Sequence, residues 1–221
     1  MSPVYKPEHY DFLYEKSSRN RILVTAKTLF ATLGYDNTST AVIARNAGTS
    51  ESQLMKHFGG KANLLETIFS EGWERINNKL AACFQAATDL NARLSCIPGT
   101  VFESLDEDLE LKTLLLLEGH RMRDVARKEP AREGYARFLR LIDEAIAEAE
   151  KNGEIRSHMP SLPLRSAIVG MVVSGARQQV LASRSAFPAN YGSEEIRTLL
   201  SAFLSTIIND SFTHGRHARV A

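Results

Sequence analysis

Residues 38–61, TSTAVIARNAGTSESQLMKHFGGK, contain two short helical patterns separated by a single glycine. Ser39 or Thr40 can cap the first helix and Ser50 can cap the second, because such side chains accept hydrogen bonds from the unpaired N–H groups of a helix start. Gly48 can make the sharp turn between them, since a residue without Cβ enters left-handed conformations at little cost. The spacing predicts a helix-turn-helix.

Longer helical patterns flank this motif on both sides. A first helix is predicted over residues 18–33, where apolar side chains recur at i, i+3 and i+4 before Gly34 ends the pattern. A long helix is predicted to begin near Lys61, after Gly59 and Gly60. Together with the motif, these helices predict a compact N-terminal head.

The second helix of the motif, residues 50–58, combines two inward apolar positions with a polar outer surface. The amide of Gln53 can pair with donor and acceptor groups on a base edge, and lysines can reach phosphates. Backbone N–H groups at the helix start near Lys61 also suit a phosphate oxygen. An ordinary solvated helix surface, which uses the same residue types, is the alternative. The residues that we expect to contact DNA are Thr40, Ser50, Ser52, Gln53, Met55, Lys56, His57 and Lys61.

Charge is distributed unevenly along the chain. The net charge of all 221 residues is only +1, which argues against a polybasic nucleic-acid binder. Residues 17–61, however, hold six basic residues against Asp36 and Glu51, a net charge of +4, so the rest of the chain is mildly acidic. A positive head on an acidic body suits a protein that touches a polyanion at one end.

Every periodic segment beyond residue 80 is helical, and no alternating strand pattern of useful length appears. Breakers such as Pro98-Gly99, Pro130 and Asn152-Gly153 divide this part of the chain. We therefore predict an all-α protein with a three-helix helix-turn-helix head and a larger helical-bundle body. The helices expected in the body cover residues 91–97, 103–128, 131–151, 164–185 and 194–213.

The head carries one spaced set of residues that is specific as a whole: Leu29, Phe30, Gly34, Tyr35, Thr40, Ile43, Ala44, Ala47, Gly48, Ser50, Leu54, His57, Phe58, Lys61, Leu64 and Leu65. Through this set, residues 19–65 resemble the DNA-binding head of the tetracycline-repressor (TetR) family of transcriptional regulators. Met55 departs from the family, which commonly has a tyrosine there that contacts a phosphate.

The resemblance implies a DNA-binding regulator, most often a repressor, that leaves a palindromic operator when a small molecule binds the body. It also implies a homodimer formed through the last two long helices. The alternative is a small-molecule-binding helical scaffold whose operator recognition has degenerated. The expected parts are a flexible arm (1–16), the DNA-binding domain (17–64), an effector-binding and dimerisation domain (65–213) and a tail (214–221).

Two further sets of residues follow from the expected body. Aromatic, methionine and leucine side chains of the middle helices are candidates for an effector site, although core packing uses the same residues. The effector candidates are Phe102, Leu116, His120, Met122, Tyr135, Phe138 and Met171. The expected dimer contacts, on two apolar stripes, are Leu164, Ile168, Met171, Val172, Gly175, Ile196, Leu200, Phe203, Leu204 and Ile207.

Cys83 and Cys96 are expected to be two small apolar side chains rather than a disulfide. If both lay on one helix, thirteen residues would separate them by about 20 Å, far beyond bridging range. A reducing cytoplasm is therefore the expected compartment.

No motif of an enzyme is apparent: there is no phosphate-binding glycine loop, no HExxH and no serine elbow. The longest apolar stretch, residues 167–176, is too short to span a membrane. We accordingly expect no catalytic role, no cofactor, no metal and no membrane partner.

Overall fold

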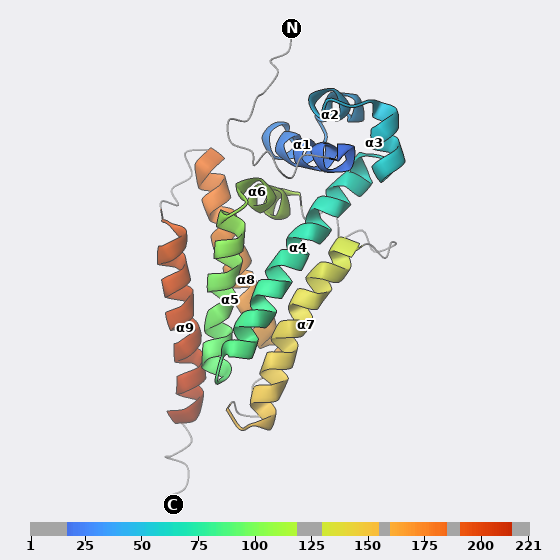
Figure 1. Ribbon diagram of the computed structural model, residues 1–221. Coiled ribbons are helices and arrows are strands. Elements are labelled where there is room, and N and C mark those ends of the chain that lie inside the picture. The colour runs from blue at the N-terminus through green and yellow to red at the C-terminus, as the bar shows by residue number, and fades with distance from the viewer. Residues whose placement is uncertain (1–16, 119–129, 155–159, 185–190, 214–221) are drawn as a thin grey trace, which may run out of the picture.

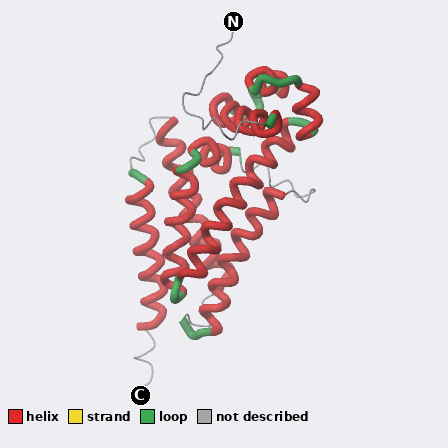
Figure 2. The backbone as a smooth tube through the Cα atoms, in the orientation of Figure 1, coloured by secondary structure: helices red, strands yellow, loops and turns green. Residues whose placement is uncertain are grey.

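The computed structural model describes residues 17–118, 130–154, 160–184 and 191–213. Within these ranges every element of secondary structure is a helix, which confirms the predicted class (Figure 2). The helices are α1 (Ser18–Leu33), α2 (Thr40–Asn46), α3 (Glu51–Phe58), α4 (Lys61–Ala86), α5 (Leu90–Asp106), α6 (Leu109–Leu117), α7 (Pro130–Lys151), α8 (Ser161–Arg184) and α9 (Ser193–Thr213). The expected arm and tail lie outside the described residues.

Helices α1, α2 and α3 gather at one end of the molecule, and we call them, with the first turns of α4, the head (Figure 1). α4 continues from the head along the length of the remaining helices, which form the body, and it packs on α7 and α5. α5 in turn packs on α9. A single helix therefore links the two parts, so the expected boundary at residues 64 and 65 falls inside α4.

Helix caps explain why the head folds as the sequence predicts. The hydroxyl of Ser39, rather than that of Thr40, caps α2 by accepting a hydrogen bond from Val42 N–H, and Ser50 caps α3 through Gln53 N–H. Gly59 ends α3 in the left-handed conformation, with φ at 72°. Local sequence signals therefore determine the ends of these helices.

Two apolar cores meet at α6. The head core is built from α1–α4, yet it includes Leu111 and Leu114 of α6. The body core holds residues of α4, α5, α7, α8 and α9. Leu115 packs against both cores. Close approach of α6 to α4 depends on Gly72, where an added Cβ would lie 2.7 Å from Leu111 Cδ1. α6 is therefore shared between head and body.

Two boundaries predicted for the body are wrong. Pro98 and Gly99 do not end a helix, because α5 runs through them and is buried between α4 and α9. The expected helix over residues 103–128 is instead divided at Asp108, whose carboxylate caps α6 by accepting the N–H of Leu111 at 3.0 Å. The packing of α5 on α4 and α9 stabilises this helix by more than Pro98 destabilises it. The buried cap at Asp108 starts α6 at a position where no helix start was predicted.

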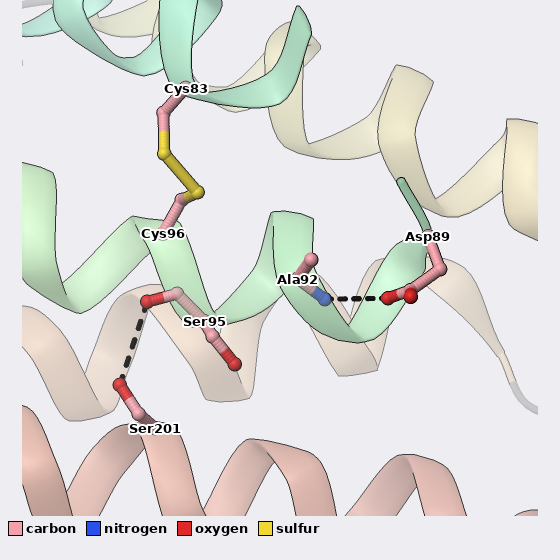
Figure 3. Close-up of a disulfide and its surroundings, with 6 residues drawn as sticks. All are labelled: Cys83, Asp89, Ala92, Ser95, Cys96 and Ser201. Atoms are coloured by element: carbon pink, nitrogen blue, oxygen red, sulfur yellow. Dashed lines mark hydrogen bonds between the residues drawn. A yellow bond between two sulfur atoms is a disulfide. The ribbon is translucent and has the colours of Figure 1, made fainter. Parts of the chain in front are cut away.

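The cysteine prediction is also wrong: Cys83 and Cys96 form a disulfide (Figure 3). The chain reverses at residues 87–89, so the two residues lie on adjacent helices, α4 and α5, rather than on one helix. Their Cα atoms are 6.3 Å apart. The predicted separation of about 20 Å assumed that both cysteines lie on one helix, and that assumption is wrong.

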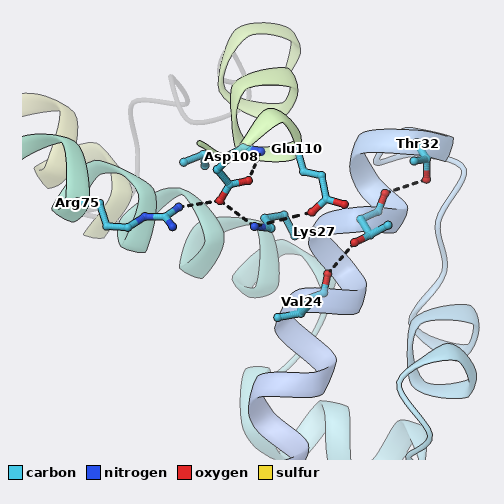
Figure 4. Close-up of polar contacts among 8 residues, drawn as sticks. Val24, Lys27, Thr32, Arg75, Asp108 and Glu110 are labelled. Atoms are coloured by element: carbon cyan, nitrogen blue, oxygen red, sulfur yellow. Dashed lines mark hydrogen bonds and ion pairs between the residues drawn. The ribbon is translucent and has the colours of Figure 1, made fainter. Parts of the chain in front are cut away.

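The buried carboxylate of Asp108 joins the head to the body (Figure 4). Its Oδ2 accepts hydrogen bonds from Lys27 Nζ of α1 and from a guanidinium N–H of Arg75 of α4, each at 2.8 Å. Only 8% of this side chain is exposed. Burial opposes ionisation of the carboxyl, but the bonds from Lys27, from the backbone and from Arg75 outweigh it and lower the pKa of Asp108.

Candidate nucleic-acid interface and effector cavity

α3 has the two surfaces that a recognition helix needs. Leu54 and Phe58 are buried in the head core, whereas Ser52, Gln53, Met55, Lys56 and His57 are exposed, as the sequence predicted. Residues of a recognition helix that face away from the core can enter the major groove of DNA. The exposed side of α3 is therefore the candidate nucleic-acid interface.

Several expected DNA contacts are already engaged within the head. Thr40 donates its hydroxyl hydrogen to the carboxylate of Glu51, and Ser50 is the cap of α3. His57 Nε2 lies 2.9 Å from the hydroxyl of Ser18. These residues fix α2, α3 and α1 relative to one another, so they position the interface.

Gln53 and Lys56 differ from those three residues. In the part of the chain that the structure describes, no other side chain bonds the amide of Gln53 or the ammonium of Lys56. Both are exposed on α3 and are available to a ligand. Met55 is also exposed, over 48% of its surface, and its side chain offers an apolar contact for a thymine methyl.

The ammonium of Lys61, an expected DNA contact, is engaged within the head. Its Nζ donates to the backbone carbonyls of Tyr35 at 2.9 Å and Thr38 at 3.2 Å, and it lies 4.4 Å from the centre of the Tyr35 ring. The start of α4, where the sequence predicted a phosphate contact, has no side-chain cap, so no capping side chain occupies its first N–H groups. Arg45, exposed in the last turn of α2, is a cation that the sequence analysis counted but did not assign to the interface.

The body contains a cavity of about 590 Å³ between α4, α5, α6, α7 and α8, within the range of small-molecule sites. The sequence predicted two of its residues, Leu116 and Tyr135. The other lining residues are Trp73, Ile76, Val101, Leu105, Leu115, Leu117, Arg132, Val172, Val173, Ala176 and Arg177.

The remaining effector candidates lie elsewhere. Phe102 and Phe138 are buried in the body core, where they fill space instead of lining the cavity. Met171 borders a groove between α8 and α9. His120 and Met122 lie outside the described residues.

The lining is mostly apolar with polar groups at a few points. The rings of Trp73 and Tyr135 are in contact, with centres 5.1 Å apart and planes tilted by 50°. The indole N–H of Trp73 is buried and has no hydrogen-bond acceptor among the described residues. Arg132 and Arg177 supply the positive charge. A ligand with an apolar chain and an anionic or acceptor group matches this lining.

Half of the expected dimer contacts belong to the core of one protomer. Helix packing turns them inward, because α9 packs on α5, and α8 packs on α6 and α7. The residues buried in this way are Leu164, Ile168, Val172, Leu200 and Leu204. Gly175 is also buried, and Ile196 is half-buried against the core. The side chain of Ile207 lies outside the described residues.

A second apolar surface remains on α8 and α9, and we call it the α8–α9 surface. Leu199 is 63% exposed, and Phe203, which the sequence predicted, is 49% exposed. Met171 and Gly170 of α8 border the groove beside Leu199. Large apolar side chains exposed on one helix beside an apolar groove are a candidate protein–protein contact.

No group of three or more metal-binding side chains occurs among the described residues. None of the helices in the same ranges combines the length and apolar character that crossing a membrane requires.

Comparison with known proteins agrees with the arrangement of the head. Residues 22–68 match the model of the bacterial regulatory proteins of the tetR family. The HTH-type transcriptional regulator LmrA of Bacillus subtilis is 28% identical over 144 residues, covering 59% of this chain and 72% of that protein.

Solved structures share the fold beyond the head. The transcriptional regulator FadR of Bacillus subtilis, in complex with stearoyl-CoA, has a TM-score of 0.73 at 19% identity, over 84% of this chain and 97% of that one. AibR, in complex with isovaleryl coenzyme A and operator DNA, has a TM-score of 0.65 at 20% identity, over 85% of this chain and 97% of that one. Both likenesses extend over the body as well as the head.

Proposed function

The chain belongs to the TetR family of bacterial regulatory proteins, and from this premise we propose that it is a transcriptional repressor released from its operator by an acyl-CoA thioester. The observation that carries this proposal is the pairing of an exposed recognition helix with a cavity in the body. DNA binding belongs to the head, and effector binding belongs to the body.

Gln53 and Lys56 are the residues that support operator binding most directly. The amide of Gln53 can pair bidentately with adenine, which carries sequence information, whereas Lys56 supplies charge for a phosphate, which does not. Arg45 and the N–H groups at the start of α4 add further phosphate contacts.

The cavity suits an acyl chain whose polar end meets the arginines. Leucine, valine and aromatic side chains line most of it, and Arg132 and Arg177 provide the charge that phosphates or a carboxylate require. FadR binds stearoyl-CoA and AibR binds isovaleryl coenzyme A, and both share the fold of this body. We therefore place the acyl chain in the cavity and the anionic part of the ligand at the arginines.

α6 provides a route from the cavity to the head. Leu115 and Leu117 line the cavity, and Leu115 also packs on the head core. At its other end, α6 starts at Asp108, which binds Lys27 of the head. Filling the cavity would press on α6 and favour a head position that no longer matches the operator.

A homodimer formed through the α8–α9 surface would present two copies of α3. A two-fold dimer requires two half-sites related by the same symmetry, so the operator is expected to be palindromic. A protein that binds the chromosome of a bacterium acts in its cytoplasm, and we propose that location.

The test uses the full-length protein and DNA flanking its own gene. Fluorescence anisotropy at several salt concentrations should give a steep fall of affinity with salt, because phosphate contacts release counterions. Acyl-CoA thioesters from four to eighteen carbons are then titrated into the complex, with free coenzyme A as the control. At least one chain length should release the DNA.

Two results would contradict the proposal. Operator binding that none of the thioesters changes would indicate a regulator with another effector. Thioester binding without any DNA binding would favour the alternative, a small-molecule-binding scaffold whose operator recognition has degenerated.

Arg177→Ala should weaken the thioester response while operator affinity without ligand stays unchanged, because Arg177 lines the cavity and lies outside the head.

A further inference from the structure

The disulfide between Cys83 and Cys96 joins the last turn of α4 to α5 (Figure 3). The reversal between the two helices does not depend on this bond. Asp89 caps α5, and the carboxylate of Glu154 accepts a hydrogen bond from Leu90 N–H at 2.6 Å. The bond therefore adds a constraint to a turn that other contacts already hold.

We propose that Cys83 and Cys96 form a reversible thiol–disulfide switch that controls how far α4 can move relative to α5. The proposal rests on the proposed function, since a repressor on a bacterial chromosome works in a compartment where thiol reductants keep most cysteines reduced. Disulfides in that compartment are usually transient and respond to oxidants. Both side chains are half-buried, so reductants and oxidants can reach them.

The position of the disulfide allows it to affect DNA binding, because it lies on the helix that carries the head. α4 carries the head at its first turn and Cys83 in its last turn. α5 packs along α9, and the hydroxyl of Ser201 on α9 donates to the carbonyl of Ser95, one residue before Cys96, at 3.5 Å (Figure 3). Oxidation therefore links α4, which carries the head, covalently to α5, which packs on α9 of the proposed dimer surface.

A hydroperoxide is the class of oxidant that this pair can use. Cys96 packs against the body core and Cys83 does not, so a peroxide meets the sulfur of Cys83 first. The Cys83 thiolate attacks one oxygen of hydrogen peroxide and the O–O bond breaks. The departing hydroxide takes up the proton that the thiol lost, so a sulfenic acid and one water result. The Cys96 thiolate then attacks the sulfenic sulfur and forms the S–S bond. The S–O bond breaks, and the hydroxide that leaves takes up the proton lost by the Cys96 thiol to give a second water. Two thiols are oxidised and one peroxide is reduced.

The first experiment compares operator affinity in the two redox states of the full-length protein. The chain has only two cysteines, so counting free thiols defines each state without ambiguity. We expect oxidation by hydrogen peroxide to weaken operator binding by roughly five- to tenfold, and dithiothreitol to restore it, because a fastened α4 cannot adjust both heads to two half-sites. The variant with Cys83→Ser and Cys96→Ser should keep the reduced value under both treatments.

Equal operator affinity in two states with confirmed thiol counts would overturn the switch and leave a structural bond. A second measurement does not depend on DNA. Amide hydrogen exchange across residues 80–96 should be slower in the oxidised protein. If neither state binds DNA, the proposed function fails, and the exchange comparison still decides whether the bond restrains α4 and α5. Equal exchange in both states would overturn the proposal.

The order of the chemistry has its own test. In a Cys96→Ser variant treated with peroxide, dimedone should label Cys83, because the sulfenic acid there has no partner thiol. A Cys83→Ser variant should be labelled more slowly at Cys96, which packs against the core. Faster labelling of Cys96 would show that the peroxide attacks the other sulfur and would overturn this assignment.

Discussion

Lys27 Nζ lies 2.8 Å from Asp108 Oδ2, and this ion pair fastens α1 of the head to the residue that caps α6 of the body (Figure 4). Arg75 of α4 binds the same carboxylate oxygen at 2.8 Å. One buried carboxylate therefore holds three helices together where the two cores meet. Because α6 also lines the cavity, the geometry at Asp108 determines how a change in the cavity reaches the head.

Asp108→Asn removes the charge of this junction and keeps the cap, because asparagine caps helices as well as aspartate does. The free energy of unfolding should fall by roughly 1–3 kcal/mol, measured by urea denaturation at a fixed protein concentration. Asp89→Asn is the matched control, since Asp89 caps α5 in the same way but is exposed. An equal loss in both variants would show that replacing any capping carboxylate by an amide has this effect, and that the ion pair adds nothing.

The same carboxyl predicts a dependence on pH. The pKa of Asp108 is lower in the folded protein, so its stabilisation is present above the unfolded pKa of about 3.9 and is lost as pH falls through the folded value. The difference in unfolding free energy between the wild type and Asp108→Asn should be constant above about pH 5 and should shrink at lower pH. Urea denaturation at a series of pH values measures it. A difference that grows toward acid would contradict the lowered pKa.

Gly72→Ala tests how closely α6 packs on α4. The added Cβ would lie 2.7 Å from Leu111 Cδ1, so the buried Leu111 side chain or α6 itself must shift, and the free energy of unfolding should fall by roughly 1–3 kcal/mol. Gly99→Ala is the control, because the nearest atom to an added Cβ there is Arg197 Cδ at 3.7 Å. That variant should be unchanged or slightly more stable in thermal denaturation, since alanine favours a helix more than glycine does. Equal behaviour of the two variants would mean that the α4–α6 contact is loose.

The head could be predicted from the sequence because its determinants are local. Capping residues such as Ser50 and the glycines that end helices act over three or four positions, and the predicted ends of α1 and α3 agree with the structure to within one residue. The inward positions Leu54 and Phe58 follow from helical spacing alone. A stretch of sequence carries such information without reference to the rest of the chain.

The body was less predictable because its features depend on packing between distant segments. Trp73 and Arg177 share the cavity although about a hundred residues separate them, and no spacing rule brings them together. Cys83 and Cys96 pair only because the chain reverses between them. One signal was available: Asp108, followed by Glu110 in the first turn, has the pattern of a helix start and could have replaced Pro98 as the expected boundary.

The lysines near α3 should differ in their effects. Lys56→Ala should weaken binding to all DNA sequences alike and reduce the slope of log affinity against log salt by about one. Lys61→Met should instead lower the thermal stability of the head, because the carbonyls of Tyr35 and Thr38 lose their donor. Anisotropy across a salt series and thermal denaturation separate the two effects. A Lys61→Met variant of normal stability with a reduced salt slope would show that its ammonium leaves the carbonyls when DNA binds.

Phe203→Glu should convert the protein to a monomer if the α8–α9 surface forms the dimer. A charge placed at the centre of an apolar contact loses solvation without gaining a partner, which costs several kcal/mol. Leu109→Glu is the matched control, because Leu109 is also exposed, at 64%, but lies at the start of α6. Sedimentation velocity at micromolar concentration should give a monomer for Phe203→Glu and a dimer for the control and the wild type.

The monomer should also bind the operator much more weakly, because a single head reaches only one half-site. Dimers in all three samples would place the contact between protomers on another surface.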